Sequence, residues 1–206
     1  MIGRRGIFGY NKEIKEKEGT ITMNHLIEKP HSSTQRFQGR VVGVYEDQVI
    51  LPNGTMAQRD VVRHPGGVCV LALTAEQEVI FVRQYRYVLD QLTLEIPAGK
   101  LDPTDSEPEA AARRELAEET PYTAQALELL HAFYPTPGFC DEKLYLYLAH
   151  GVELNSELTP DDDEFVDVVT YPLPEALAML AAGEITDGKT IMALQAYALR
   201  LAGVQK

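Results

Sequence analysis

Apolar and polar residues alternate through the first half of the chain in the way typical of β-strands. Residues 36–51 and 55–64 are predicted to form strands that are joined at an Asn-Gly turn. Residues 68–86 contain an apolar run, a short polar turn and a second apolar run, which predicts a hairpin buried on at least one face. Residues 92–102 add a brief strand that ends at a proline and a glycine. The first half is therefore expected to be β-structure.

The pattern becomes helical at residues 107–120, which are rich in Ala, Glu, Arg and Leu and place Pro108 where a helix can begin. Three further strands and then two helices closed by glycines are predicted at residues 127–134, 143–154, 164–173, 174–183 and 189–203. This order of elements predicts an α/β (α+β) fold, in which a mixed β-sheet is sandwiched between helices. The strands before residue 62 form an N-terminal antiparallel β extension to that fold.

Three segments are expected along the chain. Residues 1–22 alternate Lys and Glu without an apolar face, so we expect a poorly ordered leader, and Met23 is an alternative natural start. Residues 23–61 are predicted to be the β extension, and residues 62–206 the main domain. The leader lacks the apolar region of a secretory signal, and no apolar run approaches the length of a membrane span.

The composition limits the compartment and the partners. Cys69 and Cys140 lie far apart, without metal-binding or redox spacing, so we expect a cytoplasmic protein with two reduced thiols. The formal net charge of −12 argues against binding to nucleic acid, whose phosphates need a basic face. A small anionic substrate is compatible with this charge if a few arginines or a metal ion supply positive charge locally. We therefore expect a small-molecule substrate, and neither a nucleic-acid nor a membrane partner.

Three glutamates, Glu115, Glu118 and Glu119, stand within five residues of the predicted helix. A solvated helix with salt bridges is the ordinary explanation of such a run, and Arg114 and Glu118 fit it as an i,i+4 pair of opposite charge. Glu115 and Glu119 have no cation at a spacing of three or four, and they repel each other. A divalent ion would remove that repulsion, and oxygen ligands with few carboxylates suit Mg²⁺ or Mn²⁺. The helix alone leaves the surface and the metal-binding interpretations open.

These glutamates belong to a longer motif that begins at Gly99, in the turn EIPAGKLD before the helix. The core of the motif is formed by Arg114, Glu115, Leu116, Glu118 and Glu119. The pattern resembles the signature of the Nudix hydrolases, G-x(5)-E-x(7)-R-E-U-x-E-E-x-G-U, in which U is aliphatic. The resemblance implies a Nudix-type fold with a bound divalent ion, for which Glu115 and Glu119 are ligands. The carbonyl of Ala98 is a candidate third ligand, and Glu118 is a further one.

The match departs from the family pattern at two places. One residue is inserted between Lys100 and Arg113, so the first glutamate of the motif is left without an assigned counterpart, and Asp105 and Glu107 are both candidates. Pro121 replaces the final glycine. Proline cannot take the positive φ that glycine offers after a helix, and it disfavours the α conformation of the residue before it. We therefore expect the metal-binding helix to end by a different route.

The resemblance covers roughly residues 62–201 and extends to the ADP-ribose pyrophosphatase subfamily, whose usual proline after the motif is matched by Pro135 and Pro137. It implies metal-dependent hydrolysis of the pyrophosphate bond of a nucleoside diphosphate sugar, with ADP-ribose giving AMP and ribose 5-phosphate. Two alternatives stay open. The first is a pyrophosphatase for another nucleotide sugar, such as GDP-mannose, or for a dinucleoside polyphosphate. The second is a non-catalytic nucleotide-binding module.

The same resemblance implies roles for four residues outside the motif. Glu164, in the acidic loop TPDDDEFVDV, matches the subfamily's general base, and either of the two preceding aspartates is an alternative. Arg86 matches an arginine that contacts phosphate, and Glu142 matches a glutamate that contacts the substrate near the ribose. Members of the subfamily usually form homodimers through the N-terminal β extension, and Arg63 is a candidate to reach the neighbouring subunit's substrate. Each role has a plainer alternative. Glu164 would belong to a solubilising acidic loop, Arg86 would form an ordinary surface pair, and Glu142 would be an ordinary acidic loop residue.

Overall fold

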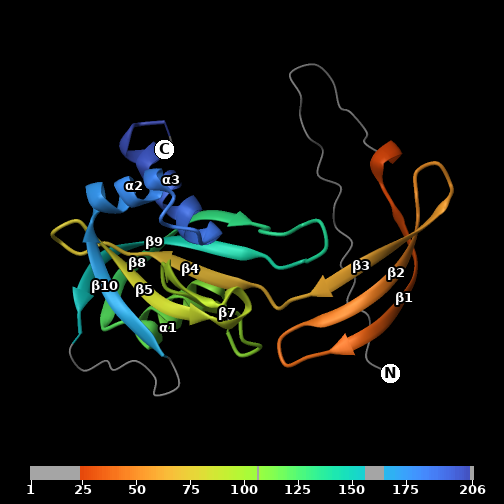
Figure 1. The fold of residues 1–206 in the computed structure, drawn as a ribbon, viewed down its shortest axis with the longest axis horizontal. Helices are drawn as coiled ribbons and strands as arrows, with labels where there is room; N and C mark the ends of the chain where they lie inside the picture. The colour runs from red at the N-terminus through yellow and green to blue at the C-terminus, as the bar shows by residue number, and fades with distance from the viewer. Residues whose placement is uncertain (1–23, 106, 156–164, 205–206) are drawn as a thin grey trace.

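A computed structural model of the chain describes residues 24–105, 107–155 and 165–204 (Figure 1). The predicted leader, residues 1–22, therefore lies outside the described residues. The described chain forms a small sheet at one end and a larger body of sheets and helices at the other, and Figure 1 shows the two joined through β3 and β4.

The N-terminal sheet contains three antiparallel strands in the order β1-β2-β3, with a short 3₁₀ helix, η1 (Asn24–Leu26), before them. The strands are β1 (Lys29–Gln38), β2 (Gly43–Ile50) and β3 (Met56–Arg63). The predicted Asn-Gly turn joins β2 to β3, and its Gly54 has a φ of +85°, which glycine tolerates. β1 begins earlier than the sequence predicted. The prediction missed its first residues because they are exposed and mostly polar, so they show no apolar alternation.

The body contains two sheets. The mixed sheet has the order β7-β4-β9-β8, in which β4 and β9 are parallel and the other pairs are antiparallel. The second sheet is antiparallel, in the order β10-β5-β6. The strands are β4 (Gly67–Leu71), β5 (Glu78–Arg86), β6 (Gln91–Glu95), β7 (Ala98–Lys100), β8 (Tyr122–Phe133), β9 (Leu144–Leu154) and β10 (Val166–Pro172), and η2 (Tyr87–Leu89) is a 3₁₀ turn between β5 and β6.

Helices cover both faces of the central strand β4, which is fully buried. Val68 and Val70 belong to the core cluster that contains Leu116 of α1 (Pro108–Glu119). Cys69 and Leu71 belong to the opposite cluster, which includes residues of α2 (Leu173–Ala182) and α3 (Gly188–Leu201). This confirms the predicted α/β architecture, with a mixed sheet between helices and a β extension. None of the helices in the described ranges is long and apolar enough to cross a membrane.

The prediction that residues 68–86 form a hairpin is wrong, except for the few residues beside the turn. Leu73 and Val79 form an isolated antiparallel bridge, but β4 and β5 then separate and pair within different sheets. A strand that is buried on both faces, as β4 is, carries apolar residues without alternation, so its sequence does not reveal which neighbour it pairs with.

Helix α1 begins with Pro108 in its first turn, as predicted, and ends at a residue in extended conformation. Thr120 has φ −142° and ψ 158°, which agrees with the effect expected of Pro121 on the residue before it. Its buried hydroxyl donates to the carbonyl of Leu116 (2.5 Å) and accepts from the backbone N–H of Tyr122 (3.2 Å). The side chain of Thr120 thus closes the helix directly before Pro121, which occupies the position of the family's glycine, and β8 starts at Tyr122.

Candidate active site

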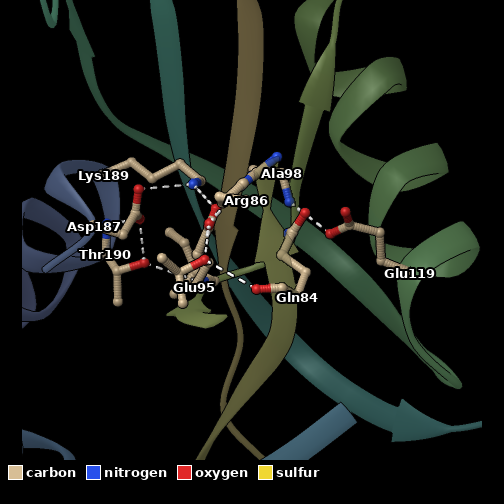
Figure 2. Close-up of polar contacts among 10 residues, drawn as sticks. Gln84, Arg86, Glu95, Ala98, Glu119, Asp187, Lys189 and Thr190 are labelled. Atoms are coloured by element: carbon tan, nitrogen blue, oxygen red, sulfur yellow. Dashed lines mark hydrogen bonds and ion pairs between the residues drawn. The ribbon is translucent and has the colours of Figure 1, made fainter. Parts of the chain in front are cut away.

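A cavity of about 670 Å³ opens between the β7–α1 segment and the N-terminal end of α3. Six of the residues to which the sequence assigned a role line it, namely Arg86, Ala98, Glu115, Glu118, Glu119 and Glu142. Figure 2 shows Glu119 of α1 on one side of Arg86 and Ala98, and the first residues of α3 on the other side. The cavity therefore has an acidic wall, formed by α1, and a second wall that contains cationic side chains.

The acidic wall is built around two buried carboxylates. Glu115 is only 7% exposed and Glu119 only 4%. Oε2 of Glu119 accepts a hydrogen bond from the backbone N–H of Ala98 (2.9 Å). At Gly99, an added Cβ would lie 2.0 Å from Cδ of Glu115, so only glycine allows the carboxylate to sit against this backbone. Gly99 therefore has a local steric role in addition to its place in the turn.

Arg114 organises the neighbouring charges. Its Nη1 contacts Oε2 of Glu118 (2.6 Å), which confirms the predicted i,i+4 pair. The same nitrogen lies 2.9 Å from Oε1 of Glu115. The expectation that Glu115 has no local cation is therefore wrong, because the long side chain of its immediate neighbour folds back to it. Burial alone would lower the pKa of Arg114, but the hydrogen bond to Asp105 and the charges of Glu115 and Glu118 outweigh burial and raise that pKa.

The segment between β7 and α1 contains Asp105, and α1 is preceded by Glu107; these are the two candidates for the first glutamate of the motif. Asp105 accepts hydrogen bonds from the backbone N–H of Asp102 (2.7 Å) and from Nη2 of Arg114 (3.3 Å). Glu107 is the N-cap residue of α1, and its side chain makes no capping hydrogen bond. Of the two candidates for the first motif glutamate, Asp105 is therefore the one that the structure brings to the motif arginine.

The donors on the acidic wall fit a divalent cation. Buried carboxylates need a compensating positive charge or hydrogen bonds, and Glu115 and Glu119 lie four residues apart on one helix. Within the described part of the chain, no three acidic, imidazole or thiol side chains lie close enough to hold an ion by themselves. An ion at this wall would complete its coordination with backbone oxygen, water and substrate phosphate, which is the preference of Mg²⁺.

The opposite wall contains an ion-pair network that the sequence did not reveal. Glu95, 2% exposed, accepts from Nε and Nη2 of Arg86 (2.7 and 2.6 Å) and also contacts Nζ of Lys189 (Figure 2). Burial by itself would raise the pKa of the Glu95 carboxyl, but the bonds from Arg86 and the charge of Lys189 lower it to about 2. Lys189 is 94 residues from Glu95 in sequence, so no local spacing connects them.

Of the remaining predicted residues that the structure describes, Glu142 lines the cavity and Arg63 does not. Oε1 of Glu142 is 3.6 Å from Nδ1 of His64. That nitrogen also accepts a hydrogen bond from the N–H of Gly66 (3.1 Å). The guanidinium of Arg63 contacts Asp141 (3.1 Å).

The predicted base, Glu164, and the two aspartates before it lie outside the described residues. Val166 begins β10 and pairs with Gln84 of β5, which lines the cavity. The chain therefore returns to the site two residues after Glu164.

Comparison with known proteins agrees with the geometry. The family model described as the NUDIX domain matches residues 63–194. An ADP-ribose pyrophosphatase of Bacillus subtilis (strain 168) is 44% identical over 179 residues, which are 86% of this chain and 96% of that protein. A methanol dehydrogenase activator of Bacillus methanolicus is also 44% identical, over 82% of this chain and 91% of its own.

A solved structure shares the fold. The crystal structure of an ADP compounds hydrolase superposes with a TM-score of 0.73, at 21% sequence identity, and the match covers 85% of this chain and 95% of that chain.

We predict that Gly99→Ala weakens Mn²⁺ binding by about tenfold or more, the scale for disturbing a group that orients a metal ligand. The added Cβ would displace the Glu115 carboxylate from its position. Titration calorimetry with Mn²⁺ measures the effect, and circular dichroism checks that the variant is folded. Gly138→Ala is the matched control, because a Cβ there meets nothing within 4 Å. Equal affinity in Gly99→Ala and the wild type would contradict an ion site beside Glu115.

Proposed function

Because this chain belongs to the NUDIX family and is a Nudix hydrolase, we propose that it is a metal-dependent pyrophosphatase that converts ADP-ribose to AMP and ribose 5-phosphate. The observation that carries the proposal is the pairing of an acidic wall with a cationic wall across one cavity. A diphosphate needs cations on both sides, and a divalent ion held by Glu115 and Glu119 would complement Arg86. The 44% identity to an ADP-ribose pyrophosphatase supports this choice of substrate.

In the proposed reaction, Glu115 and Glu119 hold Mg²⁺, with Mn²⁺ as the alternative, and Ala98 and Glu118 are the further candidate ligands. A bound ion would neutralise charge on the diphosphate and would favour deprotonation of water. The protein orients the pyrophosphate for in-line attack of water on phosphorus, and cleavage of the P–O bond releases AMP and the sugar phosphate.

Arg86 contacts the diphosphate through its planar guanidinium, a geometry that suits phosphate oxygens. Glu142 lines the same cavity, and its proposed role is to contact the substrate near the ribose. Glu164 accepts the proton of the attacking water. Its position in the chain, two residues before the strand residue that pairs with Gln84, is compatible with that role.

We further propose that the protein is a homodimer formed through the N-terminal sheet, residues 23–61 of the predicted extension. Leu26, Ile27, Phe37 and Met56 expose large apolar side chains there, and Figure 1 shows this sheet set apart from the body. Arg63 would then face the partner's substrate. Light scattering should give about twice the chain mass of 22.9 kDa, whereas a monomer at micromolar concentration would contradict the proposal. The cytoplasmic location stays a prediction, supported by two free cysteines.

The experiment that tests the function is incubation of the protein with ADP-ribose, GDP-mannose and a dinucleoside polyphosphate, each with Mg²⁺ or Mn²⁺, while released mononucleotide is measured. AMP from ADP-ribose as the dominant product, abolished by a chelator, is the expected result. GMP from GDP-mannose as the dominant product would assign the other nucleotide sugar instead. Binding without turnover of any compound would leave a nucleotide-binding module and overturn the proposal.

We predict that Glu119→Gln lowers turnover by at least roughly a hundredfold, the scale for losing one main electrostatic stabiliser. The amide oxygen can still accept from the N–H of Ala98, so the variant removes the charge and keeps the local bond. Glu109→Gln is the matched control on the same helix, since Glu109 makes a surface pair with Arg113 (2.9 Å). Near-normal turnover of Glu119→Gln would show that Glu119 does not hold the ion.

A further inference from the structure

The cationic wall depends on one carboxylate that is shielded from water. Both oxygens of Glu95 accept from Arg86, and Oε1 also accepts from the hydroxyl of Thr93 (2.7 Å). The two bonds from Arg86 use the Nε–Nη2 edge of the guanidinium. The Nη1 edge is therefore the part of the side chain that remains for a ligand, and Arg86, whose side chain is 40% exposed, lines the cavity.

Glu95 is held in turn by α3. Lys189, in the first turn of that helix, contacts Glu95 and has a side chain only 11% exposed. Its Nζ also lies 2.9 Å from Oδ1 of Asp187, the N-cap residue of α3. Oδ2 of Asp187 accepts from the backbone N–H (2.9 Å) and the hydroxyl (2.6 Å) of Thr190, which places its charge at the positive end of the helix.

The helix is also tied to the strand segment that leads to the acidic wall. The backbone N–H of Ile96, which follows Glu95, donates to the hydroxyl of Thr190 (2.9 Å). Two residues further on is Ala98, whose N–H holds Glu119. The start of α3 therefore fixes Glu95 and the backbone beside the proposed metal site at the same time (Figure 2).

We propose that Lys189 and Glu95 are positioning residues that aim Arg86 at the substrate's diphosphate. Glu95 clamps one edge of the guanidinium, and Lys189 holds Glu95 in place and offsets its negative charge. Without Lys189, Glu95 would keep only Arg86 and Thr93 as side-chain partners in the described part of the chain, and the carboxylate that orients the guanidinium would be less firmly held. This inference rests on the proposed function, because it assigns Arg86 the diphosphate as its ligand.

A double-mutant cycle tests whether Lys189 acts through Arg86. The variants are Lys189→Met, Arg86→Ala and their combination, and the measurements are kcat and KM for ADP-ribose with Mg²⁺ and calorimetric binding of ADP-ribose in chelator. Lys189→Met should raise KM and the dissociation constant about tenfold. A change of this size corresponds to the free energy of one hydrogen bond to a charged group. In the Arg86→Ala background the same change should add less than about twofold, because the two residues act as a unit. Lys189→Arg should recover most of the lost affinity.

Arg200→Met is the matched control, since Arg200 lies on the same helix and pairs with Glu128 (2.7 Å) outside the cavity. It should leave KM unchanged. If Lys189→Met does not fold, Glu95→Gln replaces it in the cycle and should show the same dependence on Arg86.

The outcomes separate this inference from the proposed function. Equal effects of Lys189→Met in both backgrounds would overturn the inference, because Lys189 would then act on the substrate directly or only on folding. If ADP-ribose binds but is not hydrolysed, and Lys189→Met still weakens binding less in the Arg86→Ala background, the proposed function is overturned and the inference is supported. Absence of ADP-ribose binding in the wild type would overturn both.

Discussion

The two buried carboxylates of Glu115 and Glu119 are the constraint around which the site is arranged. Removing a carboxylate from water is costly unless hydrogen bonds or cations replace the water. Here the N–H of Ala98 and the guanidinium of Arg114 supply part of that compensation. Gly99 leaves the room for the close approach, because any side chain at that position would collide with Glu115. A divalent ion bound by the same carboxylates is the compensation that hydrolysis of a diphosphate would use.

The overall charge of −12 is compatible with an anionic substrate if a bound divalent ion and the free edge of Arg86 supply positive charge inside the cavity. Arg86 and Lys189 share one buried glutamate on the wall that faces α1. Placing a carboxylate between two cations reduces their mutual repulsion and fixes their geometry, which an exposed pair of long side chains would not achieve. The two walls are thus maintained by strand ends, by the C-terminal half of α1 and by the first turn of α3.

Much of the acidic wall could be predicted because its parts are close in sequence. Gly99 and the residues from Arg114 to Glu119 lie on one strand end and one helix, so their spacing carries the information. The start of α1 at Pro108 and the extended conformation of Thr120 before Pro121 follow from the restricted geometry of proline, and both were predicted. The contact between Arg114 and Glu115 was missed, because adjacent helical residues do not normally face each other.

By itself, the sequence determined the family, the α/β architecture and the two glutamates with their glycine, because helical periodicity, proline geometry and a contiguous motif are local properties. Only the tertiary structure decided that β4 and β5 separate into different sheets, since a strand buried on both faces has no polar side to indicate its partners. Only the fold, likewise, brought Lys189 to Glu95 across 94 residues. Ion pairs over such distances depend on how elements pack around a shared core, and that packing is not encoded in the spacing of any one segment.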